Sequence, residues 1–229
     1  NISYVKWDMN RHMTEPGSAL LDAKNQKEMP HRYMLGLYRC MDEITKAHPD
    51  VLFESCSGGG GRFDPGILYY MPQTWTSDDT DAVERLYIQY GTSMAYPTSS
   101  MGAHVSAVPN HQVGRITSLK ARGDVAMSGN FGYELDLTKL SAEEKEIVKN
   151  QVKTYKMLRE FVPSSDMYRL IDPFKKDVCA WEFVSKDKTK VFAGYFRKMI
   201  IPNHPDERLK FKALDPDALY RDVERNTEW

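Results

Sequence analysis

Short apolar runs alternate with amphipathic stretches through the first two thirds of this 229-residue chain. A β-rich run at 2–6 and an apolar run at 51–54 flank a stretch that begins near Pro30, carries apolar residues at helical spacing and ends before Pro49. Strands that alternate with helices form parallel sheets, because a crossover helix returns the chain to the edge from which it started. The pattern therefore predicts a parallel β/α architecture.

The same rhythm extends almost to Pro163, so further elements are expected in the same order. They are strand ends at 68–70 and near Trp75, a helix capped by Ser77 and closed by Gly91, strands at 104–108 and 125–127, and a helix opened by a capping box at Ser141. Together with the first strand-helix-strand unit, these elements predict several consecutive β/α units.

Beyond Pro163 the character of the sequence changes. Short β segments separated by turn residues are expected at 168–170, 178–184, 191–201 and 209–214. Polar and apolar residues alternate around Phe183, which is typical of an antiparallel sheet with one solvated face. We therefore expect two domains, a β/α domain over residues 1–162 and an all-β domain over 163–229 that is itself incomplete.

Charge and composition narrow the classes of partner. Lys and Arg total 31 against 32 Asp and Glu, so no basic excess favours nucleic acid or an anionic membrane surface. No run of about eighteen apolar residues predicts a membrane-spanning helix. The chain starts at Asn1 and enters a strand almost at once, so we expect an upstream region that would carry any targeting signal.

Cysteine and histidine patterns predict no metal site. Cys40, Cys56 and Cys179 are widely spaced and form no Cys-x-x-Cys pair, which indicates neither a disulfide framework nor a zinc site and favours a reducing compartment. His104 and His111 lack the paired spacing of a zinc motif, and we interpret them as ordinary polar contacts.

Two acidic segments carry the candidate chemistry. Asp8 follows the apolar tip of the first strand, where Lys6 would point to the same side and favour the ionised, nucleophilic carboxylate. Alternatively, Asp8 caps a loop and pairs with Lys6 structurally. Asp78, Asp79 and Asp81 form the second cluster. They are either the charged first turn of a helix or part of a pocket in which crowding keeps one carboxyl group protonated as a general acid.

A glycine-rich segment and two tryptophans complete the candidate site. Residues 56–62 lack the Gly-Lys-Ser/Thr ending of a nucleotide loop, so their four glycines indicate close backbone approach to a ligand, or else a flexible turn. Trp7 and Trp75 lie beside the acidic segments, where they are either platforms for a pyranose ring or large core residues. Two carboxylates and aromatic platforms favour a sugar as substrate.

Three motifs, taken in order, resemble a single family. They are the Lys-Trp-Asp-Met-Asn-Arg run at 6–11, the Cys-Ser-Gly-Gly-Gly-Gly-Arg-Phe-Asp run at 56–64, and the Trp-Thr-Ser-Asp-Asp-Thr-Asp-Ala run at 75–82. Together they resemble bacterial α-galactosidases of glycoside hydrolase family 36, and the likeness extends over the whole chain. The resemblance implies that Asp8 is the nucleophile and Asp78 the acid/base. The galactose contacts that it implies are Lys6, Cys56 and Gly59, with Trp75 alongside.

The resemblance also implies a fold. Family members have a large N-terminal β-sandwich, a (β/α)8 barrel and a C-terminal β domain, and many are tetramers. A complete barrel needs roughly 250 residues. Residues 1–162 are therefore expected to form a partial (β/α)8 TIM barrel, about units four to eight, followed by an antiparallel β-sandwich domain. Strands outside this segment would supply further galactose ligands, so we expect the segment alone to be inactive.

The expected activity is that of a retaining exo-α-galactosidase that removes terminal galactose from oligosaccharides such as melibiose and raffinose, with no metal or cofactor. The resemblance to bacterial enzymes, together with the cysteine pattern, predicts a cytoplasmic enzyme. The resemblance also implies that the full-length parent is a homo-oligomer, a tetramer. Two alternatives stay open at this point. One is galactosyl transfer, as in raffinose and stachyose synthases, and the other is a non-catalytic carbohydrate-binding relative.

Overall fold

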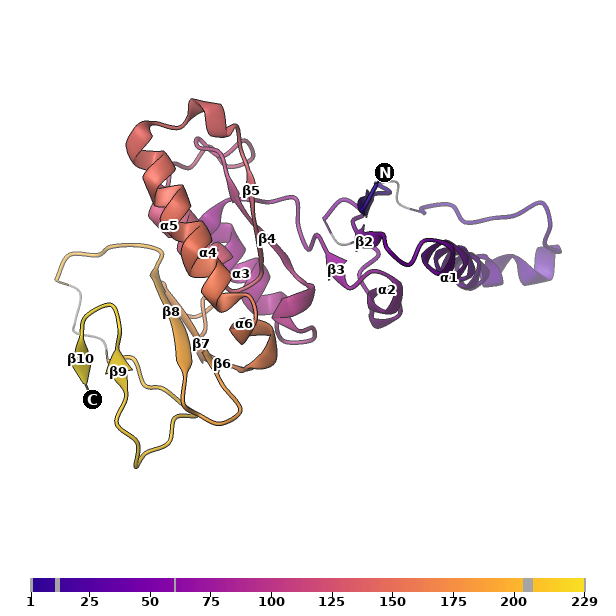
Figure 1. Ribbon diagram of the computed structural model, residues 1–229. Coiled ribbons are helices and arrows are strands. Elements are labelled where there is room, and N and C mark those ends of the chain that lie inside the picture. The colour runs from indigo at the N-terminus through magenta and orange to yellow at the C-terminus, as the bar shows by residue number, and fades with distance from the viewer. Residues whose placement is uncertain (1, 11–12, 60, 204–207, 229) are drawn as a thin grey trace.

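The computed structural model describes residues 2–10, 13–59, 61–203 and 208–228 (Figure 1). Its parallel strands are β1 (Tyr4–Trp7), β2 (Leu52–Ser55), β3 (Gln73–Thr74), β4 (Gly102–Ser106) and β5 (Asn130–Glu134). β1, β2 and β3 pair in chain order, β4 pairs with β5, and a parallel bridge from Thr74 to Met101 joins the two groups. The predicted parallel β/α architecture is confirmed, and the five strands follow one another in a single order.

Helices follow these strands along the chain (Figure 1), and α1, α2 and α4 pack against one face of them. They are α1 (Met29–Ala47), α2 (Pro65–Tyr70), α3 (Ala82–Thr92), α4 (Leu119–Ala126), α5 (Ala142–Leu158) and α6 (Phe161–Ser164), with 3-10 turns η1 (Ala23–Glu28), η2 (Thr98–Ser100) and η3 (Leu137–Lys139). The capping box predicted at Ser141 is present at the start of α5. Among the described helices, none is both long and apolar enough to cross a lipid bilayer.

Alternating side chains give the sheet two different faces. Outward residues such as Val5 and Phe53 pack on α1 and α2 around the fully buried Met41, and Ala103 and Val105 pack with α4. Because successive side chains of a strand point to opposite faces, the polar neighbours of these residues lie on the other, inner face of the sheet. The inner face is therefore polar at the carboxyl ends of the strands, where the site lies.

An antiparallel sheet follows the β/α region. β6 (Asp166–Ile171), β7 (Val178–Val184) and β8 (Val191–Arg197) pair in that order, and β9 (Arg221–Asp222) pairs with β10 (Thr227–Glu228). Trp181 and Phe183 of β7 share a core with Leu86 and Tyr90 of α3, so this sheet packs directly on a helix of the β/α region. The division at 162/163 stays a prediction.

Two segments predicted as strands are helical. Residues 68–70 belong to α2, because Asp64 accepts a hydrogen bond from Ile67 N–H at 2.9 Å and Pro65 suits the first turn. Residues 125–127 lie at the end of α4, which Ser118 caps. Ser77 was predicted to cap the next helix, but α3 begins after Asp81, which is its N-cap.

The all-β region also differs from its prediction in two ways. Residues 209–214 form no strand, and the additional pairing is the short β9–β10 hairpin. β7 is buried on both faces, including Glu182, because α3 covers one side and the segment near Lys212 covers Glu182, whose Oε1 accepts from Lys212 N–H at 2.8 Å. The solvated face expected for this strand is therefore wrong.

Candidate active site

Asp8 lies directly after β1, at the carboxyl ends of the parallel strands. Asn10 Nδ2 donates to Asp8 Oδ2 at 3.1 Å, and Asn10 Oδ1 accepts from Gly58 N–H at 2.7 Å. The Cys56 thiol also hydrogen-bonds to the Asp8 carboxylate. Asp8 is thus an exposed carboxylate whose orientation is set by the ends of two neighbouring strands.

The pKa of Asp8 lies below its ordinary value. The slight burial of the carboxyl group opposes this shift, and hydrogen bonds from Asn10, from Cys56 and from two backbone N–H groups outweigh it. Lys6, which the sequence suggested as the source of this stabilisation, is not among the largest causes. The Lys6 ammonium instead lies 4.9 Å from the centre of the Trp75 ring. The lowered pKa agrees with the expected ionised state, and its main causes are hydrogen bonds and not the charge of Lys6.

The glycine-rich loop after β2 is fastened to the segment after β1. Ser57 Oγ donates to the carbonyl oxygen of Met9. Arg62 is buried and donates to the carbonyl oxygens of Trp7 at 3.0 Å and Cys56 at 2.6 Å. Hydrogen bonds from a charged guanidinium are strong, so Arg62 holds these two strand ends together.

The acidic segment after β3 meets the same loop at Gly59. Gly59 has a φ of +73°, and a Cβ added there would lie 2.4 Å from the backbone nitrogen of Asp78. Only glycine permits both the positive φ and so close an approach. Gly58 bonds to Asn10 beside Asp8, and Gly59 lies against Asp78, so two adjacent glycines bring the two acidic segments together.

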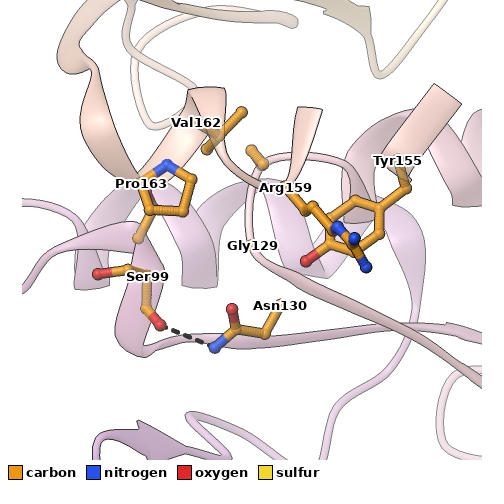
Figure 2. Close-up of a pocket in the computed structure, with 9 residues that line it drawn as sticks. Ser99, Gly129, Asn130, Tyr155, Arg159, Val162 and Pro163 are labelled. Atoms are coloured by element: carbon orange, nitrogen blue, oxygen red, sulfur yellow. Dashed lines mark hydrogen bonds between the residues drawn. The ribbon is translucent and has the colours of Figure 1, made fainter. Parts of the chain in front are cut away.

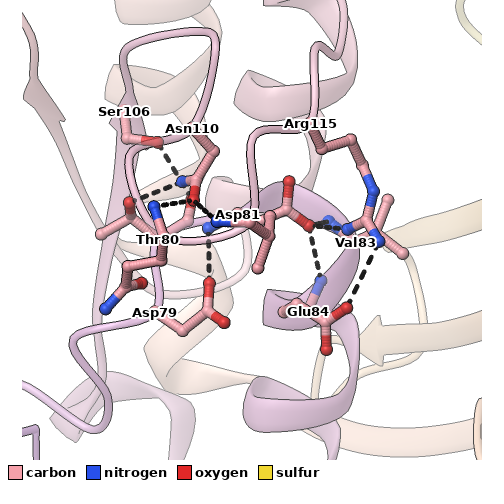
Figure 3. A network of polar contacts seen from close by, with 10 residues as sticks. Asp79, Thr80, Asp81, Val83, Glu84, Ser106, Asn110 and Arg115 are labelled. Carbon is pink, nitrogen blue, oxygen red and sulfur yellow. Dashed lines mark hydrogen bonds and ion pairs between the residues drawn. The ribbon is translucent and has the colours of Figure 1, made fainter.

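In the second acidic cluster, two of the three carboxylates are committed to local structure (Figure 3). Asp81 caps α3 by accepting from two N–H groups of its first turn at 3.0 and 3.1 Å, and it pairs with Arg115. Asp79 accepts from Asp81 N–H at 3.0 Å. Asp78 is exposed, and its carboxylate has no hydrogen bond or ion pair to any residue that the structure describes.

The last residue of β4 and the loop that follows it fix the backbone of this cluster from its other side (Figure 3). Ser106 Oγ donates to the Thr80 carbonyl oxygen at 3.0 Å, and Asn110 Nδ2 donates to the Thr80 hydroxyl at 3.1 Å. Both bonds are buried, where the low dielectric strengthens them. Asp78 therefore stands on a fixed backbone while its own carboxyl group faces solvent.

Trp75 lies in the interior behind the site. It is 3% exposed, the His104 ring centre is 4.5 Å from its own, and the Arg85 guanidinium carbon is 5.2 Å away. Trp7 packs against the α1 core. Trp75 therefore has no open face for a pyranose in this structure, which differs from the platform expected from the sequence. It forms the wall against which Lys6 lies.

Sequence reasoning missed three residues that hold the site. Asn10 and Arg62 lie inside two of the quoted motifs, so their position was a usable signal. Arg115 follows Asp81 by 34 residues and no local pattern links the two. Two further residues of these motifs, Arg11 and Gly60, lie outside the part of the chain that the structure describes.

A cavity between α5, α6 and the first residue of β5 lies at the opposite strand ends (Figure 2). Ser99, Asn130 and Arg159 line it, and its volume of about 10 Å³ suits a single water. Within the described residues, no group of three or more His, Cys, Asp or Glu side chains could hold a metal ion.

Family models and curated relatives match this chain. The Melibiase model matches residues 1–165, and the model of the glycosyl hydrolase family 36 C-terminal domain matches residues 178–229. Alpha-galactosidase AgaA of Geobacillus stearothermophilus is 64% identical over 219 residues, which are 96% of this chain and 30% of AgaA. Alpha-galactosidase 1 of Pediococcus pentosaceus is 48% identical over 222 residues, 97% of this chain and 30% of that protein.

Solved structures show the same relationship. AgaA in complex with raffinose superimposes with a TM-score of 0.93 at 63% identity, covering 96% of this chain and 31% of that chain. The alpha-galactosidase of Lactobacillus brevis gives a TM-score of 0.95 at 50% identity, covering 99% of this chain and 31% of that one. This chain is thus a TIM-barrel fragment with a C-terminal sheet domain and spans under a third of these relatives. It belongs to the melibiase family and carries the C-terminal domain of glycosyl hydrolase family 36.

Proposed function

We propose that the protein containing this chain is a retaining exo-α-galactosidase that releases terminal α-linked galactose from oligosaccharides such as melibiose and raffinose. The observation that carries the proposal is the contact of Gly59 with Asp78, next to the bond between Gly58 and Asn10 beside Asp8. The segments that carry Asp8 and Asp78 both contact this one loop, which supports a reacting pair of carboxylates. Relatives named alpha-galactosidase, including AgaA crystallised with raffinose and stachyose, support the substrate class.

The spacing of two aspartates gives further support. In the Geobacillus enzyme, one aspartate was replaced by asparagine in the raffinose complex and another by alanine in the stachyose complex. Those two positions are as far apart along that chain as Asp8 and Asp78 are along this one. Replacing acidic residues while keeping bound substrate is the usual way to stop turnover, so the match favours Asp8 and Asp78 as the reacting pair.

The proposed reaction is a double displacement. Asp78 protonates the glycosidic oxygen while Asp8 Oδ attacks the anomeric carbon, so that the bond to the leaving sugar breaks and a galactosyl-enzyme ester forms. Asp78, now a carboxylate, takes a proton from water. The hydroxide oxygen bonds to the anomeric carbon, and Asp8 leaves as a carboxylate.

The environment of each carboxyl group suits its role. Hydrogen bonds from Asn10 and Cys56 favour the ionised Asp8 that nucleophilic attack needs. Asp78 has a fixed backbone and a solvent-facing carboxyl group, which suits repeated gain and loss of a proton. A retaining enzyme further requires a carboxyl separation of about 5 to 5.5 Å when galactose is bound.

The arc of five strands supports a more detailed assignment of the fold. We assign them to about units four to eight of a (β/α)8 barrel and place the boundary to a C-terminal β-sandwich domain near residue 163. The remaining strands would close the barrel and complete the galactose pocket, so this segment alone is expected to be inactive. A homotetramer in the bacterial cytoplasm remains the proposed state of the complete enzyme.

The decisive experiment is Asp8→Gly in the complete protein, assayed with an activated aryl α-galactoside in the presence of azide. Removal of the nucleophile leaves room for azide on that face, so β-galactosyl azide is expected from a variant that is otherwise inactive. Asp50→Gly, in the exposed turn before β2, is the control and should keep wild-type turnover. Wild-type rates in Asp8→Gly without azide would refute the assignment.

A further inference from the structure

A stack of rings lies on the inner face of the sheet, behind Lys6. Trp75 follows β3 and His104 lies in β4; their ring centres are 4.5 Å apart and their planes are inclined by 34°. The Lys6 ammonium is 4.9 Å from the Trp75 ring centre. A cation within about 6 Å of an aromatic face is attracted by the ring quadrupole. Lys6, Trp75 and His104 therefore form one continuous chain of contacts.

Two glycines shape the backbone to receive these rings. A Cβ on Gly102 would lie 2.8 Å from Cε3 of Trp75, and a Cβ on Gly132 would lie 2.9 Å from Cδ2 of His104. Gly132 is the register partner of His104 on β5. Each ring thus rests on a strand position where any side chain would displace it. The stack is a fitted arrangement, because both of its supports lack a Cβ.

Charged groups from three elements face His104. They are Glu134 at the end of β5, whose Oε2 is 3.6 Å from His104 Nδ1, Lys6 of β1 and Arg85 of α3. Burial lowers the pKa of His104 below its ordinary value; Glu134 opposes this shift, and the charges of Lys6 and Arg85 add to it. The imidazole is therefore neutral at pH 7. A neutral ring can stack on the indole without repelling Lys6.

We propose that His104 is a positioning residue of the α-galactosidase reaction, which holds Trp75 and through it fixes the Lys6 ammonium in the galactose pocket. This inference rests on the proposed function. Protonation of His104 would bring a third cation to a ring that already contacts Lys6 and Arg85. Galactose binding should therefore weaken as the pH falls through the titration of His104.

The test uses the complete protein and an aryl α-galactoside, with KM and kcat measured separately. His104→Ala should raise KM about three- to fivefold, the size expected when one exposed cation–π contact is misplaced, with kcat changed less than about twofold. His104→Phe keeps a ring on the indole and should return KM to within about twofold of wild type at pH 7. An unchanged KM in His104→Ala would overturn the proposal.

A double-mutant cycle tests the route through Lys6. In a Lys6→Met background, His104→Ala should add less than about twofold to KM, because the group that it positions is already absent. Independent, multiplying effects would contradict the proposal. If His104→Ala does not fold, the proposal is tested instead by the pH dependence of KM in the wild type and in His104→Phe. Wild-type KM should rise at low pH and that of His104→Phe should not, whereas an equal rise in both would overturn the inference.

His111→Ala is the matched control, because it removes an exposed histidine of the loop that follows β4. Its KM and pH profile should equal those of the wild type. A wild-type protein without galactoside turnover would refute the proposed function itself. If the wild type is active and His104→Ala has the same KM, only the positioning role of His104 would be overturned.

Discussion

The segments that carry Asp8 and Asp78 are held in opposite ways. The carboxylate of Asp8 itself accepts hydrogen bonds from Asn10 and Cys56, whereas Asp78 is placed through its backbone, which lies against Gly59. A nucleophile must remain ionised and point at one atom, so bonds to its oxygens help it. An acid/base group must gain and lose a proton in each cycle, so fixed bonds to its oxygens would hinder one of the two states.

The largest expected effect is the loss of activity on removing either carboxylate. The nucleophile and the acid/base residue are distinguished by how this loss depends on the leaving group of the substrate. Asp8→Ala should lower kcat/KM by about 10⁴-fold or more on every galactoside, because no substrate can do without the nucleophile. Asp78→Ala should cost about 10² to 10⁴-fold on raffinose but much less on an aryl galactoside, whose phenolate leaves without protonation. Steady-state kinetics with both substrates measures this. If Asp78→Ala loses kcat/KM equally on both substrates, Asp78 would not act as the acid/base residue, and the two segments would not differ in role.

The stereochemistry of azide products sharpens the same comparison. In Asp78→Ala the galactosyl-enzyme still forms, and azide attacks it from the opposite face to give α-galactosyl azide. In Asp8→Gly the azide replaces the nucleophile and gives the β product. Nuclear magnetic resonance of the isolated azides distinguishes the anomers, and the same anomer from both variants would contradict the assignment.

The next effect concerns the glycine that links the two segments. Gly59→Ala places a Cβ 2.4 Å from Asp78 N at a φ of +73°, so it should displace the acid/base residue and lower kcat/KM about 100-fold. Gly114→Ala is the matched control, because Gly114 has a φ of +70° but no atom within 4 Å of the added Cβ. Gly114→Ala should lose about 1 kcal/mol in chemical denaturation through its positive φ alone, and Gly59→Ala should lose more, because the clash with the Asp78 backbone adds to the same strain. Equal activity losses would mean that backbone strain alone, and not the contact with Asp78, is responsible.

Helices and strands were predictable from the sequence where the local pattern of caps and apolar residues agreed with the tertiary contacts of the segment. The Ser141 capping box and the 178–184 strand appear as predicted, since each is a strong local signal. Residues 68–70 and 125–127 are apolar runs too short for their periodicity to distinguish a strand from a buried helix, and the caps at Asp64 and Ser118 decided for helix. β5, with glycine in its centre, gave no apolar run that could predict it.

The candidate site was predictable as a set of residues but not as a set of interactions. The motifs drew attention to Asp8, Asp78 and Gly59, and the resemblance supplied their roles. The motifs could not show that a hydrogen bond from Asn10, and not mainly the charge of Lys6, stabilises the Asp8 carboxylate. The partner of a side chain at this edge depends on how two strand ends meet in the fold. Arg115 was out of reach for the same reason, since its pairing with the buried Asp81 joins segments from different units.

A smaller effect tests the network behind Asp78. Arg115→Leu leaves the buried Asp81 carboxylate without its cation, although the N–H groups of α3 still bond to it. We expect a loss of about 1 to 2 kcal/mol in the free energy of unfolding, because Arg115 itself is partly exposed. Activity should fall less than about tenfold. Urea denaturation checks this, with Lys120→Ala, which breaks an exposed pair with Asp124, as a control that should cost under about 0.5 kcal/mol.

The smallest effect bears on the Asp8 side of the comparison. The pKa of Asp8 is lowered, and the ionised form attacks, so kcat/KM falls as the pH drops through that pKa. Asn10→Ala removes one of the lowering hydrogen bonds, which raises the pKa and moves the acid limb to higher pH, with a loss of only a few-fold at pH 7. The pH dependence of kcat/KM in the His104→Phe background, where the titration of His104 is absent, measures this shift. Asn130→Ala, whose amide bonds to Ser99 O at the opposite strand ends, should leave the limb in place. An unmoved limb in Asn10→Ala would show that Asp8 owes its ionisation to other groups.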